Sequence, residues 1–138
     1  MKNIFVDTNI IIDFISNRIP FGVHARHIFK LAEENRIRIY CNTHSIATTH
    51  YILRKVYPET TVREKITGLL DFMSVIAVDE EILKKALKSM HKDFADAVQI
   101  FCAHQIKNMS AIVTRNLKDF STSEIPVMAP DEFLKLFK

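Results

Sequence analysis

The sequence has few cysteines and no long hydrophobic run. Cys41 and Cys102 are its two cysteines and neither lies in a C-x-x-C pattern, which excludes a zinc knuckle or dithiol redox motif as a starting hypothesis. We expect both to pack as small hydrophobic residues. No apolar run approaches the roughly 18 residues that span a bilayer, and residues 1–3 lead directly into a strand-like segment rather than a signal peptide. We therefore expect a cytoplasmic protein without a membrane segment.

The chain also lacks a strong excess of charge of one sign. Its formal net charge is +3, which mildly favours a polyanionic partner but does not by itself select nucleic acid. Hydrophobic residues make up 48% and charged residues 25%, the balance of a soluble globular protein. No repeat, linker or low-complexity segment interrupts the chain. We expect a single domain over residues 1–138, long enough to bury a core.

Hydrophobic periodicity predicts strands that alternate with helices. Runs rich in β-branched and aromatic residues predict strands, and apolar residues three and four apart predict helices. The expected strands are 4–6, 37–41, 75–78, 111–114 and a short edge strand at 127–128. The expected helices open at residues 7–9 and then cover 23–34, 44–56, 61–73, 79–87, 93–107 and 130–137. Phenylalanines in or near these helices are expected in the core: Phe14, Phe29, Phe72, Phe101 and Phe133.

Local signals mark several helix ends. Thr61 and Glu64 match a capping box for the helix expected at 61–73, and Asp79 is a suitable cap for the next helix. Pro58 is expected to end the helix at 44–56. Because parallel neighbours need a crossover between them, the alternation predicts a mostly parallel sheet of four to five strands covered on both faces. The fold class is therefore α/β, a three-layer α/β/α sandwich. Such sheets bind ligands at the carboxyl ends of their strands.

Acidic and polar residues are predicted at that edge. Asp7 follows the first strand directly, and the segment 114–116 (Thr-Arg-Asn) follows the fourth. Asp93 and Asp96 lie three apart at the start of a helix and so share one face. Carboxylates are hard oxygen ligands that suit Mg²⁺ or Mn²⁺. This constellation is typical of a phosphodiesterase site.

Each of these residues also has a structural interpretation. Asp7 is a preferred residue for capping the first helix, and Asp93 and Asp96 complement the positive end of a helix dipole. Thr-Arg-Asn after a strand is an ordinary loop composition. The residues by themselves leave both interpretations open.

Three acidic segments occur in the order typical of one family. They are residues 6–9 (VDTN), 93–99 (DFADAVQ) and 114–120 (TRNLKDF), accompanied by 51–55 (YILRK), 125–127 (IPV) and 130–133 (PDEF). In these segments, and over nearly its whole length, the sequence resembles the PIN-domain proteins. The resemblance implies a PIN-like fold and a metal-dependent endoribonuclease that uses Mg²⁺ or Mn²⁺ to cleave RNA. Many bacterial members resemble VapC-type toxins, which a cognate antitoxin inhibits and which commonly form homodimers.

The resemblance also implies roles for particular residues. Carried over by position, Asp7 is the metal ligand of the first strand, Asp96 the acid on the helix and Asn116 the family's fourth polar position. Asp93 and Asp119 are nearby acids able to ligate the metal directly or through water. Polar residues expected around these groups are Thr8, Asn9, Thr114, Ser45, Thr48 and His50.

Three cations are expected to contact the RNA backbone: Arg115, Arg54 and Lys55. Tyr51 and Tyr57, next to the last two, come nearest to a base-stacking surface.

One position departs from the family. Where the family usually has a glutamate in the helix expected at 44–56, this sequence has Thr48, and no acid lies between residues 44 and 55. His50 is near enough in sequence to substitute as a ligand or base, although it also suits plain packing. Loss of a charged ligand predicts weaker metal binding. The alternative function is therefore a catalytically weakened PIN-like module that binds RNA or a protein partner.

Overall fold

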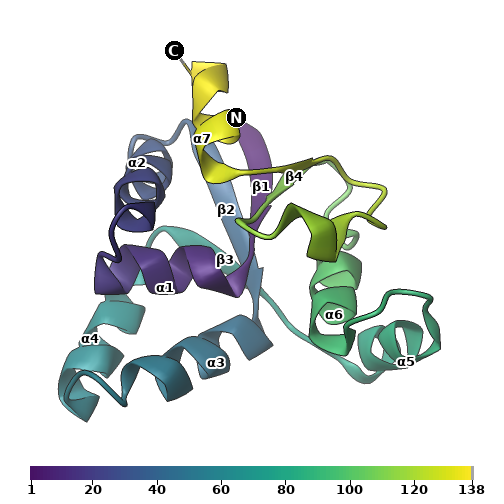
Figure 1. Cartoon of the computed structure of the whole chain (residues 1–138), viewed down its shortest axis with the longest axis horizontal. Coiled ribbons are helices and arrows are strands. Elements are labelled where there is room, and N and C mark those ends of the chain that lie inside the picture. Colours follow the sequence, from purple (N-terminus) through teal and green to yellow (C-terminus); the bar gives the residue numbers. More distant parts are fainter. Residues whose placement is uncertain (138) are drawn as a thin grey trace.

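The computed structural model describes residues 1–137, and in these residues five strands form one parallel sheet (Figure 1). The strands are β1 (Lys2–Val6), β2 (Ile37–Asn42), β3 (Met73–Ile76), β4 (Met109–Val113) and β5 (Val127–Met128). Their order across the sheet is β3-β2-β1-β4-β5. The chain leaves β1 toward one edge and later returns to the other side of β1. This reversal of direction between β1 and β4 is where an open parallel sheet forms a ligand crevice.

Helices cover both faces of this sheet. They are α1 (Thr8–Ser16), α2 (Phe21–Glu33), α3 (Thr43–Leu53), α4 (Glu59–Leu69), α5 (Glu80–Lys88), α6 (Phe94–Ala103) and α7 (Pro130–Leu134). Two 3₁₀ turns, η1 (Leu117–Phe120) and η2 (Lys135–Phe137), follow β4 and α7. In Figure 1, α1 to α4 lie on one side of the sheet and α5 and α6 on the other. The expected three-layer α/β/α fold is confirmed.

Alternating residues of β1 divide the core into two clusters. Ile4 and Val6 are fully buried and pack with Ile10 and Ile28 of α1 and α2. Phe5 is also fully buried but belongs to the cluster of α5, α6 and β4 on the other face. This division follows from the strand geometry, because successive side chains point to opposite faces. The central strand therefore anchors both layers.

The third strand begins two residues earlier than the sequence predicts. Met73, expected at the end of a helix, pairs with Ile39 in the sheet, and the register runs to Ile76 opposite Asn42. Val78, expected inside the strand, has already left it, and its amide donates to Thr43 Oγ1 at 3.1 Å. Pairing with β2 therefore sets the bounds of β3, which hydrophobicity alone could not show.

Two other local expectations are wrong. Helix α4 begins at Glu59 with Pro58 as its N-cap, so Thr61 lies inside the first turn and forms no capping box. Phe72 is 42% exposed, whereas Phe29 and Phe133 are buried as expected. The predicted cap at Asp79 is confirmed, since its side chain accepts from the amide of Ile82.

Other helix ends differ by a few residues. The helix expected at 44–56 ends at Leu53, the one expected at 93–107 ends at Ala103, and the closing helix ends at Leu134 before η2. Cys41 and Cys102 are fully buried, as expected of small hydrophobic residues. No helix within residues 1–137 is both long and apolar enough to cross a membrane.

Removal of the Phe5 ring should destabilise the domain strongly. Phe5 is fully buried in the central strand, so Phe5→Ala is expected to lower the free energy of unfolding by about 3–5 kcal/mol. Phe72→Ala is the matched control, because that ring is 42% exposed, and its cost should stay below about 1.5 kcal/mol. Urea unfolding of both variants gives the comparison, and equal costs would contradict the assignment of Phe5 to the core.

Candidate active site

Asp7 lies at the point where β1 ends and α1 begins. Its backbone is tied on both sides, because its amide donates to Val113 O at 3.0 Å and its carbonyl accepts from the amide of Ile10 at 2.9 Å. It occupies the N-cap position of α1, but its side chain makes no capping hydrogen bond. Helix capping therefore does not explain why an aspartate occupies this position.

Two side chains from distant segments hold that carboxylate. Thr114 Oγ1 donates to Asp7 Oδ2 at 2.8 Å, and Gln99 Nε2 donates to Asp7 Oδ1 at 3.1 Å. Thr114 in turn accepts from the amide of Asn116 at 3.0 Å. Asp7 is only 6% exposed. The group is thus oriented by β4 and α6, since each oxygen has a fixed donor.

Gln99 is a site residue that was not expected from the sequence. It lies three residues after Asp96, so it shares a helical face with that acid, and this spacing was the available signal. Gln99 is 6% exposed, and its Oε1 is buried without a hydrogen-bond partner among the described residues.

Asp96 experiences the charges of the other acids. Burial and the nearby carboxylates of Asp93, Asp7 and Asp119 raise the pKa of Asp96 to about 7. Asp93 caps α6, and its Oδ1 accepts from the amide of Asp96 at 3.0 Å. Asp93 is thus the N-cap of α6, and Asp96 lies in its first turn. The pKa of Asp96 also indicates that the four acids named in the sequence lie in one electrostatic neighbourhood.

Three of these acids, Asp93, Asp96 and Asp119, line a small open pocket between α6 and η1. Its volume is about 210 Å³, and its lining residues are Met90, Lys92, Asp93, Asp96, Lys118, Asp119, Ser121 and Thr122. Two lysines that the sequence analysis passed over thus flank three of the expected acids. Lys92, Lys118 and Asp119 are exposed, as is Asn116 at the start of η1. The pocket therefore combines three carboxylates with two ammonium groups.

The donor set fits a well-hydrated divalent ion. Within residues 1–137, no three side chains of His, Cys, Asp or Glu converge closely enough to form a protein cage around a metal. Mg²⁺ does not require one, because it is commonly held by one or two carboxylates and keeps several waters. Asp7 and Asp96 are the candidates for that role. The Asp7 carboxylate is held by two hydrogen bonds, and its charge contributes to the raised pKa of Asp96.

Helix α3 presents hydroxyl groups to this region instead of an acid. Ser45 is 2% exposed, and its Oγ lies 2.7 Å from Thr8 Oγ1 next to Asp7. Ser45, Thr49 and Leu53 form the buried stripe of the helix, and Thr49 Oγ1 has no partner among the described residues. Thr48 is exposed. The threonine that points inward is therefore Thr49, one position beyond the one that the family comparison indicated.

His50 has a partner on a neighbouring helix. Its Nε2 lies 2.5 Å from Glu59 Oε2 of α4, and Arg63 Nε donates to the same oxygen at 2.8 Å. These hydrogen bonds, with that from His50 the larger cause, lower the pKa of Glu59. His50 thus links α3 to α4, and the structure does not place it as a substitute for the family's glutamate.

The three cations expected to bind RNA are not gathered at the carboxylates. Arg115 forms a partly buried ion pair with Asp13, in which its Nε lies 2.7 Å from Oδ2. Arg54 and Lys55 lie over the ring of Tyr51, 5.0 and 4.5 Å from its centroid. Arg54 is nine residues beyond the buried Ser45, roughly 14 Å along the helix axis.

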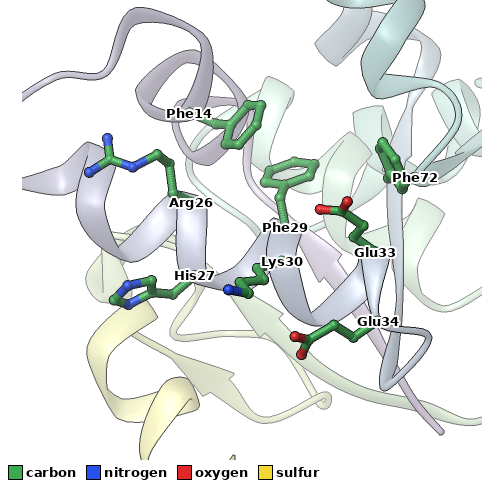
Figure 2. Close-up of a pocket in the computed structure, with 8 residues that line it drawn as sticks. All are labelled: Phe14, Arg26, His27, Phe29, Lys30, Glu33, Glu34 and Phe72. Atoms are coloured by element: carbon green, nitrogen blue, oxygen red, sulfur yellow. The ribbon is translucent and has the colours of Figure 1, made fainter.

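A larger cavity lies elsewhere in the described residues. It has a volume of about 700 Å³ and is lined by Phe14, Arg26, His27, Phe29, Lys30, Glu33, Glu34 and Phe72. Figure 2 shows the three rings along it, with Arg26 and His27 toward one end and the two glutamates toward the other. The rings of Phe14 and Phe29 are 4.5 Å apart. This hollow shares no residue with the acidic pocket, so size does not identify the chemical site.

Fold and site together define an α/β protein with acids at the switch point of a parallel sheet. The sequence model of the PIN domain matches residues 3–118. The chain therefore belongs to the PIN-domain family, whose members are generally ribonucleases. No curated protein matches the sequence.

Solved structures confirm the fold. A toxin–antitoxin complex from Klebsiella pneumoniae has a TM-score of 0.66 at 22% identity, covering 91% of this chain and 96% of that one. VapBC2 from Rickettsia felis, bound to a DNA fragment from its promoter, has a TM-score of 0.65 at 18% identity, and the covered shares of the two chains are again 91% and 96%. VapC20 from Mycobacterium tuberculosis, a toxin that cleaves the sarcin-ricin loop, has a TM-score of 0.60 at 16% identity, covering 79% of this chain and 86% of that one.

The charge of Asp96 should destabilise the domain as pH rises. A carboxyl whose pKa is raised on folding contributes full stability below its unfolded value, here 3.8, and loses it as pH rises through about 7. Asp96→Asn should therefore raise the melting temperature at pH 8 by roughly 3 °C, for about 1 kcal/mol after allowance for solvent screening. At pH 4 the variant and the original protein should melt nearly alike.

Thermal unfolding at the two pH values measures this difference. Asp71→Asn, which removes an exposed acid in the connection between α4 and β3, serves as the control. A stabilisation by Asp96→Asn that is equal at pH 4 and pH 8 would show that charge repulsion is not its cause.

Proposed function

We propose that this protein is a divalent-metal-dependent endoribonuclease. The observation that carries the proposal is the orientation of Asp7, whose two oxygens are held by Thr114 and Gln99 at the crevice between β1 and β4. A group with no part in capping its helix is buried and fixed beside a second acid whose pKa is raised. Acids in such an arrangement are suited to binding a cation.

The residues have distinct roles in the proposed reaction. Asp7 and Asp96 would hold a Mg²⁺ or Mn²⁺ ion, and Asp93 and Asp119 would be further ligands, directly or through water. When bound, the ion lowers the pKa of its water and stabilises charge on the scissile phosphate. Asn116, exposed at the start of η1, donates a hydrogen bond to a substrate oxygen.

Phosphate contacts are assigned to the lysines of the acidic pocket. Lys92 and Lys118 line that pocket and are exposed, so they offset its negative charge when the polyanion approaches. Arg54 and Lys55, beside the half-exposed ring of Tyr51, form a second contact farther along α3.

We also propose that the protein is the toxin of a toxin–antitoxin pair, acts as a homodimer and works in the cytoplasm. Two of the similar structures are toxin–antitoxin complexes, and a third is a toxin that cleaves RNA. A small DNA-binding protein encoded next to this gene is the expected antitoxin.

Loss of the Asp7 charge should abolish cleavage. Purified protein is expected to cleave RNA with Mn²⁺ or Mg²⁺ and to stop when the metal is chelated, and Asp7→Asn should remove the activity because the ion loses its rigid ligand. Glu64→Gln on α4 removes an exposed acid and should cleave normally. Undiminished cleavage by Asp7→Asn would point to a contaminating nuclease and sink the assignment.

The weakened-module alternative remains the second candidate, because α3 contributes Ser45 and Thr49 where an acid is usual. A titration with Mn²⁺ separates it from the enzyme. If millimolar Mn²⁺ leaves the melting temperature unchanged while RNA still binds, the alternative is favoured.

Removal of the two pocket lysines should weaken RNA binding in a salt-dependent way. Each lost contact to single-stranded RNA is expected to reduce the slope of log K against log salt by roughly 0.7, so Lys92→Ala with Lys118→Ala should reduce it by about 1.4. Fluorescence anisotropy with Asp7→Asn as background measures binding without cleavage.

Lys107→Ala is the control for this measurement. Lys107 is equally exposed but lies just before β4, at the opposite edge of the sheet. If its removal reduces the slope as much as the loss of the pocket lysines, the pocket is not the RNA site.

A further inference from the structure

Two adjacent residues after β4 each bind an aspartate of the α1 segment. Thr114 Oγ1 donates to Asp7 Oδ2 at 2.8 Å, and Arg115 donates to Asp13 through Nε at 2.7 Å and Nη2 at 3.3 Å. The two aspartates are six residues apart, roughly 9 Å along a helix axis. The loop after β4 is therefore attached to the N-cap residue of α1 and again to a residue six positions later in that helix.

The ion pair between Arg115 and Asp13 is partly buried. The side chain of Asp13 is 1% exposed and that of Arg115 is 20% exposed. The other cation near Asp13 is Arg18, whose Nε is 3.9 Å away and whose side chain is 49% exposed. A buried carboxylate without a close cation is strongly unfavourable, so Asp13 holds Arg115 in place.

The Arg115 guanidinium also contacts the aromatic ring of Phe21. Arg115 Cζ lies 4.0 Å from the centroid of Phe21, the first residue of α2. Gly22 has no room for a side chain, because a Cβ there would lie 2.8–2.9 Å from the backbone of Asn17. The start of α2 therefore lies in close contact with the end of α1. We call Arg115, Asp13 and Phe21 the Arg115 clamp.

The clamp acts on the segment that carries site residues. Arg115 stands between Thr114, which orients Asp7, and Asn116, whose amide donates to Thr114 Oγ1 at 3.0 Å. We propose that Arg115 is a positioning residue for the metal site and does not contact RNA. By fixing the loop it keeps the Thr114 hydroxyl aimed at Asp7. The inference rests on the proposed function, because the clamp sets the geometry of that site.

The test replaces the guanidinium of Arg115, which donates two hydrogen bonds to Asp13, by the single ammonium group of lysine. Arg115→Lys keeps the positive charge but loses the bidentate contact and the planar stack on Phe21. We expect the dissociation constant for Mn²⁺, measured by calorimetry, to rise about tenfold, as for other groups that orient a metal ligand. RNA cleavage should lose kcat at unchanged KM. Arg36→Lys, made in an exposed arginine that also lies over an aromatic ring, should change none of these values.

A second variant and a metal-free measurement complete the design. Phe21→Leu removes the stack but leaves the ion pair, and it should weaken Mn²⁺ binding in the same direction by a smaller factor. Hydrogen exchange of the Asn116 amide, followed by NMR without metal or RNA, should be faster in Arg115→Lys than in the original protein. Melting temperatures of all variants show that each is folded.

Each outcome bears on the proposal. A raised KM with unchanged kcat would show that Arg115 contacts RNA, and unchanged Asn116 exchange in Arg115→Lys would show that it does not order the loop; either result overturns the inference. If the original protein binds Mn²⁺ but cleaves no RNA, the proposed function fails by itself. Mn²⁺ affinity and Asn116 exchange then still decide the positioning role.

Discussion

The hydrogen bond from Thr114 to Asp7 joins the ends of two strands that the sheet places side by side. The residues are 107 apart in the chain, and they meet because β4 returns to pair with β1 after β2 and β3 have been added on the other side. Gln99 reaches the same carboxylate from α6, the helix that crosses over to β4. The site therefore forms only when this long connection is folded, and it cannot exist in a part of the domain.

Gathering acids at this crevice opposes folding. Burial and the charges of Asp93, Asp7 and Asp119 raise the pKa of Asp96 to about 7. Two hydrophobic clusters, one on each face of the sheet, supply the stability that tolerates this repulsion. A cation bound among the acids would relieve it, so metal binding and stability are linked in the proposed enzyme. The same repulsion is what makes the site attractive to a cation.

The sequence was sufficient for the fold because strand and helix periodicities alternate without interruption, and for Asp7 because it directly follows a strand. It could not give contacts that depend on distant segments. Arg115, expected to bind RNA, is paired with Asp13 across 102 residues, and Gln99 was recognisable only by its spacing from Asp96. The inward-facing hydroxyl on α3 belongs to Thr49, since the rotation of a helix depends on its packing. Exposed lysines carry no signal until the pocket beside them is seen.

The modest size of the acidic pocket is consistent with a polyanionic substrate. RNA is held mainly through phosphate contacts along a surface, so the chemistry needs an open crevice with flanking cations and no deep enclosure. The larger hollow instead combines the aromatic rings of Phe14, Phe29 and Phe72 with charged side chains at its two ends. It lies on the α1–α2 side of the sheet, whereas the acidic pocket lies by α6. The two linings share no residue, so a substitution in one pocket leaves the side chains of the other in place.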